Sequence, residues 1–120
     1  MTDLETIAKN YIAAWNEAEP ARRHERVEAA FAADIRYHDP IMQGDGHDGI
    51  GALIEGVHKQ FPGFRFSLKG KPDGFGDHIR FSWGLGPDGS EAVIEGTDFC
   101  VIEGGRLKRV TGFLDKVPAQ

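Results

Sequence analysis

Three polar side chains fall on faces that the sequence pattern predicts to be apolar and buried. Tyr11 lies in the middle of the apolar stripe of an expected helix, between Ile7 and Trp15. Asp39 ends a short strand on its apolar face, and Asp98 lies on the drier face of a later strand. Burying such a group without a partner costs about 1 to 3 kcal/mol, so these positions are candidates for a function.

A phenol and two carboxyl groups suit proton transfer next to a carbonyl. An ionised Asp39 at a hydrated strand end would remove a proton from carbon as general base. Tyr11 would donate a hydrogen bond to the enolate oxygen, as one member of an oxyanion hole. Asp98 would be the second donor, since apolar surroundings would raise its pKa and keep it protonated. We therefore predict Asp39, Tyr11 and Asp98 as catalytic residues.

Each of these residues also has a purely structural explanation. Tyr11 could be a core tyrosine bonded to a backbone carbonyl. Asp39 could cap the turn that follows it, and Asp98 could pair with Arg80 or Arg109. If all three explanations held, several buried polar groups would interrupt the core without a purpose, which disfavours their combination.

The first part of the chain is predicted to form two helices. Apolar residues from Leu4 to Trp15 keep the spacing of an amphipathic helix, and Thr2 with Glu5 is typical of a capping box at its start. Pro20 suits the first turn of a second helix whose apolar stripe runs to Phe31.

The period then changes to two, which predicts a short strand over residues 35–39. A glycine-containing loop at residues 44–46 follows, and Asp48 is expected to cap a third helix that runs to Phe61. From Phe64 onward, glycine turns separate alternating segments. The predicted strands are residues 64–69, 78–85, 91–103 and 106–116.

Helices first and strands last predict an α+β fold with one domain over residues 1–120. We expect three N-terminal helices packed on a curved antiparallel sheet, with a hydrophobic pocket between them. An aromatic stripe is more often plain core, but the aromatic residues are numerous enough to line a pocket as well. The residues predicted to contact a ligand are Trp15, Tyr37, Phe61, Phe81, Trp83 and Phe113.

Composition narrows the class of partner. With 120 residues, 40% hydrophobic and 28% charged, the chain is typical of one globular domain. A net charge of -5 argues against nucleic acid and anionic membranes, and no apolar run is long enough to span a membrane. A single cysteine and the absence of a signal peptide favour the cytoplasm. The histidines lack metal-ligand spacing and the glycines form no phosphate-binding motif, so we expect neither metal nor cofactor, and an apolar small molecule as partner.

Four segments in this order resemble the nuclear transport factor 2-like superfamily, and within it the SnoaL-like group and the ketosteroid isomerases. They are residues 11–16 (YIAAWN), 31–34 (FAAD), 38–40 (HDP) and 96–99 (GTDF). The resemblance covers nearly the whole chain and includes the order of three helices and a curved sheet.

The resemblance implies a role for each candidate residue and a mode of assembly. Tyr11 matches the oxyanion-hole tyrosine of the isomerases, Asp39 their general base, and Asp98 their aspartate that is kept neutral. Homodimers that pack the outer faces of their sheets are typical of the family. The implied activity is that of a ketosteroid Δ-isomerase acting on an apolar ring-containing ketone. A SnoaL-like polyketide cyclase, a non-catalytic ligand-binding protein and a protein-docking module are the alternatives.

Overall fold

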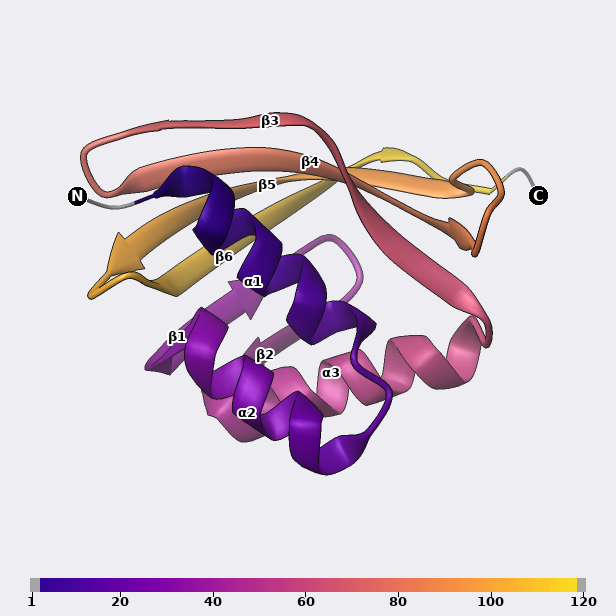
Figure 1. Ribbon diagram of the computed structural model, residues 1–120, viewed down its shortest axis with the longest axis horizontal. Helices are drawn as coiled ribbons and strands as arrows, with labels where there is room; N and C mark the ends of the chain where they lie inside the picture. The colour runs from indigo at the N-terminus through magenta and orange to yellow at the C-terminus, as the bar shows by residue number, and fades with distance from the viewer. Residues whose placement is uncertain (1–2, 119–120) are drawn as a thin grey trace.

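The computed structural model describes residues 3–118 and places three helices against one face of a curved six-stranded sheet (Figure 1). The elements are α1 (Leu4–Asn16), α2 (Pro20–Ala30), β1 (Phe31–His38), β2 (Gln43–Asp45), α3 (Gly46–Gln60), β3 (Phe64–Phe75), β4 (His78–Pro87), β5 (Ile94–Glu103) and β6 (Arg106–Lys116). The strand order is β2-β1-β6-β5-β4-β3. The α+β class and the three-helix arrangement are confirmed.

The sheet is mixed rather than wholly antiparallel, because β1 and β6 run parallel while the other neighbours run antiparallel. This pair joins the first strand of the chain to the last. It therefore brings the residues that follow β1 next to the middle of β6.

The helix starts differ from the sequence prediction in two places. Asp3 caps α1, since its carboxylate accepts hydrogen bonds from the backbone N–H of Glu5 and the hydroxyl of Thr6. The cap predicted at Thr2 lies outside the described residues. In α3 the N-cap position is Asp45 and Asp48 lies in the first turn, so the prediction of Asp48 as cap is wrong.

The second helix begins at Pro20 as predicted, and the Glu19 carboxylate accepts hydrogen bonds from two backbone N–H groups of its first turn. It ends at Ala30, because Phe31 already belongs to β1 and pairs with Leu107 of β6. The strand predicted at residues 35–39 therefore begins earlier and ends at residue 38.

Strand β3 is longer than predicted. The segment after Lys69 was expected to turn, but the chain continues as a strand to Phe75. The register with β4 shifts between Lys69 and Asp73, which absorbs the irregularity as a bulge. The reversal occurs instead near Gly76, whose φ of 56° is easy for glycine. Strand β5 is shorter than predicted, because it begins at Ile94 rather than at residue 91.

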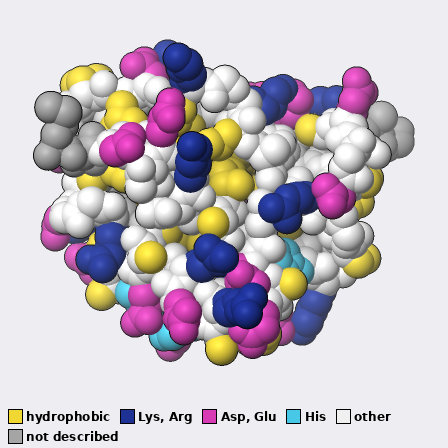
Figure 2. All heavy atoms as spheres, in the orientation of Figure 1, with side chains coloured by type: hydrophobic (Ala, Val, Ile, Leu, Met, Phe, Trp, Pro, Cys, Tyr) yellow, Lys and Arg dark blue, Asp and Glu magenta, His cyan; other side chains and the backbone are white. Residues whose placement is uncertain are grey.

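The core lies between the helices and the inner face of the sheet. The largest fully buried apolar side chains come from both layers; they are Phe31, Ile35, Ile50, Ile54 and Leu107. Outside this core, acidic and basic side chains are interspersed with small apolar areas on the face in Figure 2. Within the described residues, no helix is both long enough and apolar enough to cross a membrane.

Candidate active site

A cavity of about 550 Å³ opens between the helices and the inner face of the sheet. Its wall is mostly apolar, and Tyr11, Tyr37, Asp39 and Gln60 supply polar groups. The other lining residues are Trp15, Ile41, Met42, Val57, Phe61, Phe66, Trp83, Leu85, Ile94, Leu114, Val117 and Pro118. This volume and this lining are typical of a site for a small apolar molecule.

Asp39 lies in a turn directly after β1. Its Oδ1 atom accepts hydrogen bonds from the backbone N–H groups of Ile41 and Met42, both at 2.9 Å. Its Oδ2 atom accepts one from the hydroxyl of Tyr37 at 2.6 Å. A carboxylate offers about four acceptor positions, so one on Oδ2 remains for a ligand. Asp39 therefore caps a turn and also presents a carboxylate to the cavity.

Tyr11 connects the cavity to the second carboxyl group. Its hydroxyl donates to Oδ2 of Asp98 at 2.5 Å, and Asp98 is fully buried. Neither arginine considered from the sequence pairs with Asp98: Arg80 pairs instead with Asp73. The buried aspartate is thus held by a phenol and not by a cation.

Burial governs the protonation of these groups. Loss of solvent raises the pKa of Asp98 to about 6, although the hydrogen bond from Tyr11 and the indole of Trp83 oppose this shift. Burial also raises the pKa of Tyr11, and the nearby Asp98 charge raises it further. The pKa of Tyr37 is raised for the same two reasons, so both phenols keep their protons at neutral pH.

The protonation of Asp98 determines what Tyr11 can do, because a phenol has only one proton. When Asp98 is ionised, that proton is donated to Oδ2. When Asp98 carries a proton, the carboxyl can donate to Tyr11 and leave the phenol proton for a ligand oxygen. Because the pKa of Asp98 is about 6, the two forms interconvert close to neutral pH.

Gly112 allows the two carboxyl side chains to approach each other. It pairs with Asp98 across β5 and β6, and the pairing of His38 with Thr111 places Asp39 on its other side. A Cβ atom at Gly112 would lie 2.8 Å from Oδ1 of Asp98 and 3.1 Å from Cβ of Asp39. Both side chains therefore occupy space that only a glycine leaves free.

The structure brings most of the predicted ligand contacts to the cavity. Trp15, Tyr37, Phe61 and Trp83 line it. The other two predicted aromatic contacts do not line it, and neither does Asp98.

Phe81 lies behind the cavity wall, where its ring and that of Tyr11 are arranged edge to face with 4.9 Å between their centroids. Phe113 is 52% exposed on the outer face, because Val110 and Gly112 face inward and strand side chains alternate. Asp98 is fully buried, so it reaches a ligand only through Tyr11.

Several lining residues were missed by sequence reasoning. Phe66 packs against Trp15 and Trp83 and completes the aromatic wall. Leu114 lies two positions after Gly112, so the alternation that turns Phe113 outward also predicts Leu114 on the inner face. Gln60 at the end of α3 carried no signal.

The remaining candidates for chemistry are limited. Within residues 3–118, no group of three or more His, Cys, Asp or Glu side chains could hold a metal ion. Cys100 is buried, and burial raises the pKa of its thiol, which suits a packing role.

The SnoaL-like domain model matches residues 8–110. The chain belongs to the SnoaL-like family. A solved structure from Agrobacterium tumefaciens, described as a candidate isomerase of that family, is 48% identical, with a TM-score of 0.89. The match covers 96% of this chain and 99% of that one. None of the curated proteins matches this chain.

More distant solved structures share the fold of this SnoaL-like chain. A candidate ketosteroid isomerase from Kribbella flavida has 22% identity and a TM-score of 0.70, covering 100% of this chain and 85% of its own. A candidate polyketide cyclase from Sinorhizobium meliloti has 18% identity and a TM-score of 0.69, covering 89% and 93%. These likenesses show that the fold is shared with both of these proteins.

Proposed function

We propose that this SnoaL-like protein is a cofactor-independent isomerase that moves a proton next to the carbonyl of an apolar, ring-containing ketone. The observation that carries the proposal is that Asp39 and Tyr11 line one apolar cavity while a buried carboxyl group binds the Tyr11 hydroxyl. The name of the 48% identical relative, a candidate isomerase, supports the same reaction class.

The reaction has two proton transfers. The free position on Oδ2 of Asp39 takes a proton from the carbon next to the carbonyl. The C–H electron pair then forms a double bond to the carbonyl carbon while the C=O π electrons move to the oxygen, which gives a dienolate. Tyr11 donates a hydrogen bond to the enolate oxygen. The protonated Asp39 then returns the proton to the far carbon of the conjugated system, which restores the carboxylate and shifts the double bond.

Asp98 acts through Tyr11 in this scheme. The sequence suggested a direct donor, but its burial and its absence from the cavity wall favour a supporting role. A protonated Asp98 donates to the Tyr11 oxygen and so leaves the phenol proton for the substrate. The catalytic residues proposed are therefore Asp39 and Tyr11, with Asp98 as a positioning residue.

The same base and donor would also serve a cyclase. Removal of a proton next to a carbonyl gives an enolate, which can attack a second carbonyl of the same molecule instead of being reprotonated. The fold neighbour described as a candidate polyketide cyclase makes this a second candidate.

A third candidate is a protein that binds an apolar ligand without catalysing a reaction. It is favoured by the hydrogen bonds with which Asp39 caps its turn, because they give this carboxylate a structural role.

The test is isomerisation of a β,γ-unsaturated cyclic ketone, followed by the absorbance of the conjugated product. We expect turnover by the wild-type protein, and tight binding of an enolate-mimicking phenol that weakens in Tyr11→Phe and in Asp98→Ala. If the protein does not turn over the ketone but binds the phenol tightly, and if both variants weaken that binding, cyclisation of a dicarbonyl substrate would be favoured. Equal phenol affinity in all three proteins would leave only the binding role.

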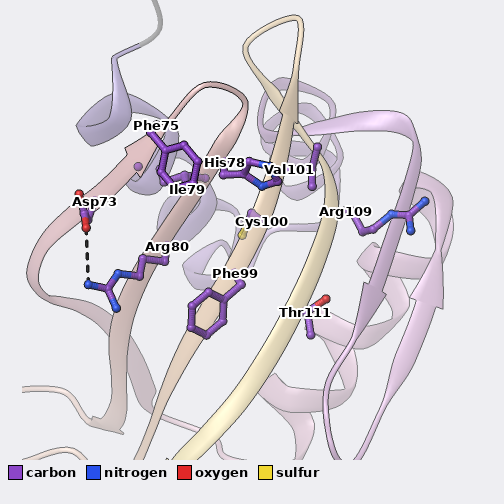
Figure 3. Close-up of a pocket in the computed structure, with 11 residues that line it drawn as sticks. Asp73, Phe75, His78, Ile79, Arg80, Phe99, Cys100, Val101, Arg109 and Thr111 are labelled. Carbon is purple, nitrogen blue, oxygen red and sulfur yellow. Dashed lines mark hydrogen bonds and ion pairs between the residues drawn. The ribbon is translucent and has the colours of Figure 1, made fainter.

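We propose further that a second copy of this chain binds the outer face of the sheet. This face is uncovered by helices, and Phe99 and Phe113 are 44% and 52% exposed there with their rings in edge contact. A groove of about 300 Å³ lies beside Phe99. In Figure 3, Arg80 lies on one side of Phe99 and Arg109 and Thr111 lie on the other.

The charge pattern of β6 is complementary to itself. Arg109, Thr111, Phe113 and Asp115 alternate on its exposed side. Two copies of β6 that cross antiparallel about Gly112 would place Arg109 of one opposite Asp115 of the other. A homodimer through this face is therefore part of the proposal.

Sedimentation velocity at low salt tests the dimer. We expect Arg109→Asp to weaken association at least about tenfold, since it places like charges opposite each other. The double variant Arg109→Asp/Asp115→Arg should restore it. A monomeric wild type, or a double variant as weak as the single one, would contradict the arrangement.

A further inference from the structure

Two buried polar atoms on the inner face of the sheet lack hydrogen-bond partners although one is a donor and the other an acceptor. They are Nε1 of Trp83 and Oδ1 of Asp98. Trp83 is 8% exposed and Asp98 is fully buried. Leaving such groups unpaired is costly, and native structures rarely do so without a reason.

The sheet register makes the two residues diagonal neighbours. Trp83 pairs with Gly96 and Phe81 pairs with Asp98 across β4 and β5. The indole lies directly over Gly96: a Cβ there would be 2.3 Å from Cζ2 and 2.7 Å from Cε2 of Trp83. Cε2 is bonded to Nε1, so the N–H edge of the indole lies over the residue two positions before Asp98.

A second glycine makes room for the acceptor. Oδ1 of Asp98 lies over Gly112, where a Cβ would be only 2.8 Å away. The interaction of Asp98 with Trp83 already favours the ionised carboxylate, although the two atoms do not meet the geometry of a full hydrogen bond. Two glycine positions thus leave room for the indole of Trp83 and for the carboxyl group of Asp98 on neighbouring strands.

We propose that Trp83 is a positioning residue that binds Oδ1 of ionised Asp98 and thereby sets the pH at which Asp98 takes up a proton and frees the Tyr11 proton for the cavity. The inference rests on the proposed function. In the ionised form, Tyr11 holds Oδ2 and Trp83 holds Oδ1, so the carboxylate is satisfied and Tyr11 is unavailable to a ligand. When Asp98 takes up a proton, Tyr11 and Trp83 no longer need to donate hydrogen bonds to a carboxylate.

Other charged or titratable groups act on Asp98 and need to be separated from Trp83. They are Tyr11 on α1, Tyr37 on β1, Asp39 after β1, Cys100 on β5 and Asp115 on β6. Both phenols and the thiol stay protonated in the neutral range because their pKa values are raised. The two carboxylates are the groups whose titration the experiment must distinguish from that of Asp98.

Indole N–H signals provide a direct readout in the ligand-free protein. The chain has two tryptophans, so a ¹H–¹⁵N spectrum contains two indole signals, which Trp15→Phe and Trp83→Phe assign. We expect the Trp83 signal to move with a single sigmoidal midpoint between pH 4.5 and 8.5. Asp98→Asn should abolish this titration, whereas Asp39→Asn and Asp115→Asn should each keep it. A flat Trp83 signal, or a titration that survives Asp98→Asn, would overturn the inference.

The second measurement is the pH dependence of binding of the enolate-mimicking phenol. Without the indole donor the ionised carboxylate is less stable, so Trp83→Phe should raise the midpoint pH by roughly one unit. Trp15→Phe is the matched control, since Trp15 also lines the cavity and also has an unpaired indole N–H. It should leave the midpoint unchanged. Equal shifts in both variants would reduce Trp83 to packing and overturn its role.

The two proposals fail in different ways. If the Trp83 signal titrates with Asp98 but no ketone is turned over, the isomerase function fails and the role of Trp83 stands as a property of the ligand site. If ketone is turned over while the Trp83 signal stays flat, Trp83 has no such role.

Discussion

The two carboxyl groups of the site have opposite surroundings although they lean over the same glycine. Asp39 lies at a strand end and accepts hydrogen bonds from two backbone N–H groups and one phenol. Asp98 lies mid-strand, fully buried, and accepts one hydrogen bond from Tyr11 while its other oxygen has no partner. The surroundings of Asp39 supply hydrogen-bond donors that stabilise a carboxylate, whereas the surroundings of Asp98 exclude the solvent that would stabilise one.

This difference teaches how one sheet can provide two acid–base roles. A strand end exposes backbone N–H groups that no neighbouring strand uses, whereas a central strand has none to offer. Position in the sheet therefore decides which aspartate is well supplied with donors. The proposed roles of base for Asp39 and proton-bearing support for Asp98 follow this division.

The largest effect is expected at the strand end. Asp39→Asn keeps the shape of the side chain and an oxygen for the turn, but it removes the base. Turnover of the ketone should fall on the order of 10²- to 10⁴-fold. Affinity for the phenol, measured by fluorescence titration, should change little because Tyr11 is intact. Undiminished turnover would remove Asp39 from the mechanism.

The next effect concerns stability and pH at the strand middle. The pKa of Asp98 is raised from 3.8 to about 6 in the folded protein, so its protonated form favours folding at low pH. That contribution is lost as the pH rises through about 6, and it corresponds to up to about 3 kcal/mol.

Asp98→Asn cannot ionise and should therefore gain stability relative to wild type between pH 4 and pH 8. Urea unfolding of both proteins at the two pH values measures this gap. A gap that is equal at pH 4 and pH 8 would mean that Asp98 titrates alike in the folded and unfolded chains.

A third change removes the space that the two regions share. Gly112→Ala places a methyl group against Oδ1 of Asp98 and Cβ of Asp39, which should cost about 1 to 3 kcal/mol of unfolding free energy. Gly51→Ala is the control, because its Cβ meets nothing within 4 Å and lies within α3. It should stabilise the protein by up to about 1 kcal/mol. Equal stabilities of the two variants would show that the carboxyl groups do not need the space over Gly112.

Much of this arrangement follows from local patterns in the sequence. The alternation along β5 puts Glu95 and Glu103 on one face and Asp98 on the opposite, apolar face. It therefore predicts correctly that Asp98 faces the core. The helical spacing around Tyr11 does the same for α1. Local periodicity predicts these positions because burial of apolar faces is what forms the elements.

Other features depend on contacts that are distant in the sequence. The parallel pairing of β1 with β6 joins segments about seventy residues apart, and no local pattern contains it. Gly112 has no side chain that would indicate which face of β6 points inward. For this reason the sequence revealed neither the role of Gly112 nor the outward direction of Phe113. The continuation of β3 past Lys69 depends on a bulge against β4, which outweighs the local turn signal.

The smallest effect separates the two phenols, one in each region. Tyr37→Phe removes one of three donors to Asp39, and the two backbone N–H groups remain, so stability should fall by only about 1 kcal/mol. Tyr11→Phe removes the donor that the ligand uses, and phenol affinity should fall at least about tenfold, as for the loss of a hydrogen bond to a charged group. Tyr37→Phe should keep phenol affinity within about twofold, because its proton is committed to Oδ2 of Asp39. Calorimetric titration of both variants measures the contrast. If Tyr37→Phe lost as much affinity as Tyr11→Phe, the ligand oxygen would lie between the phenols, and the separation of the site into a base region and a donor region would be wrong.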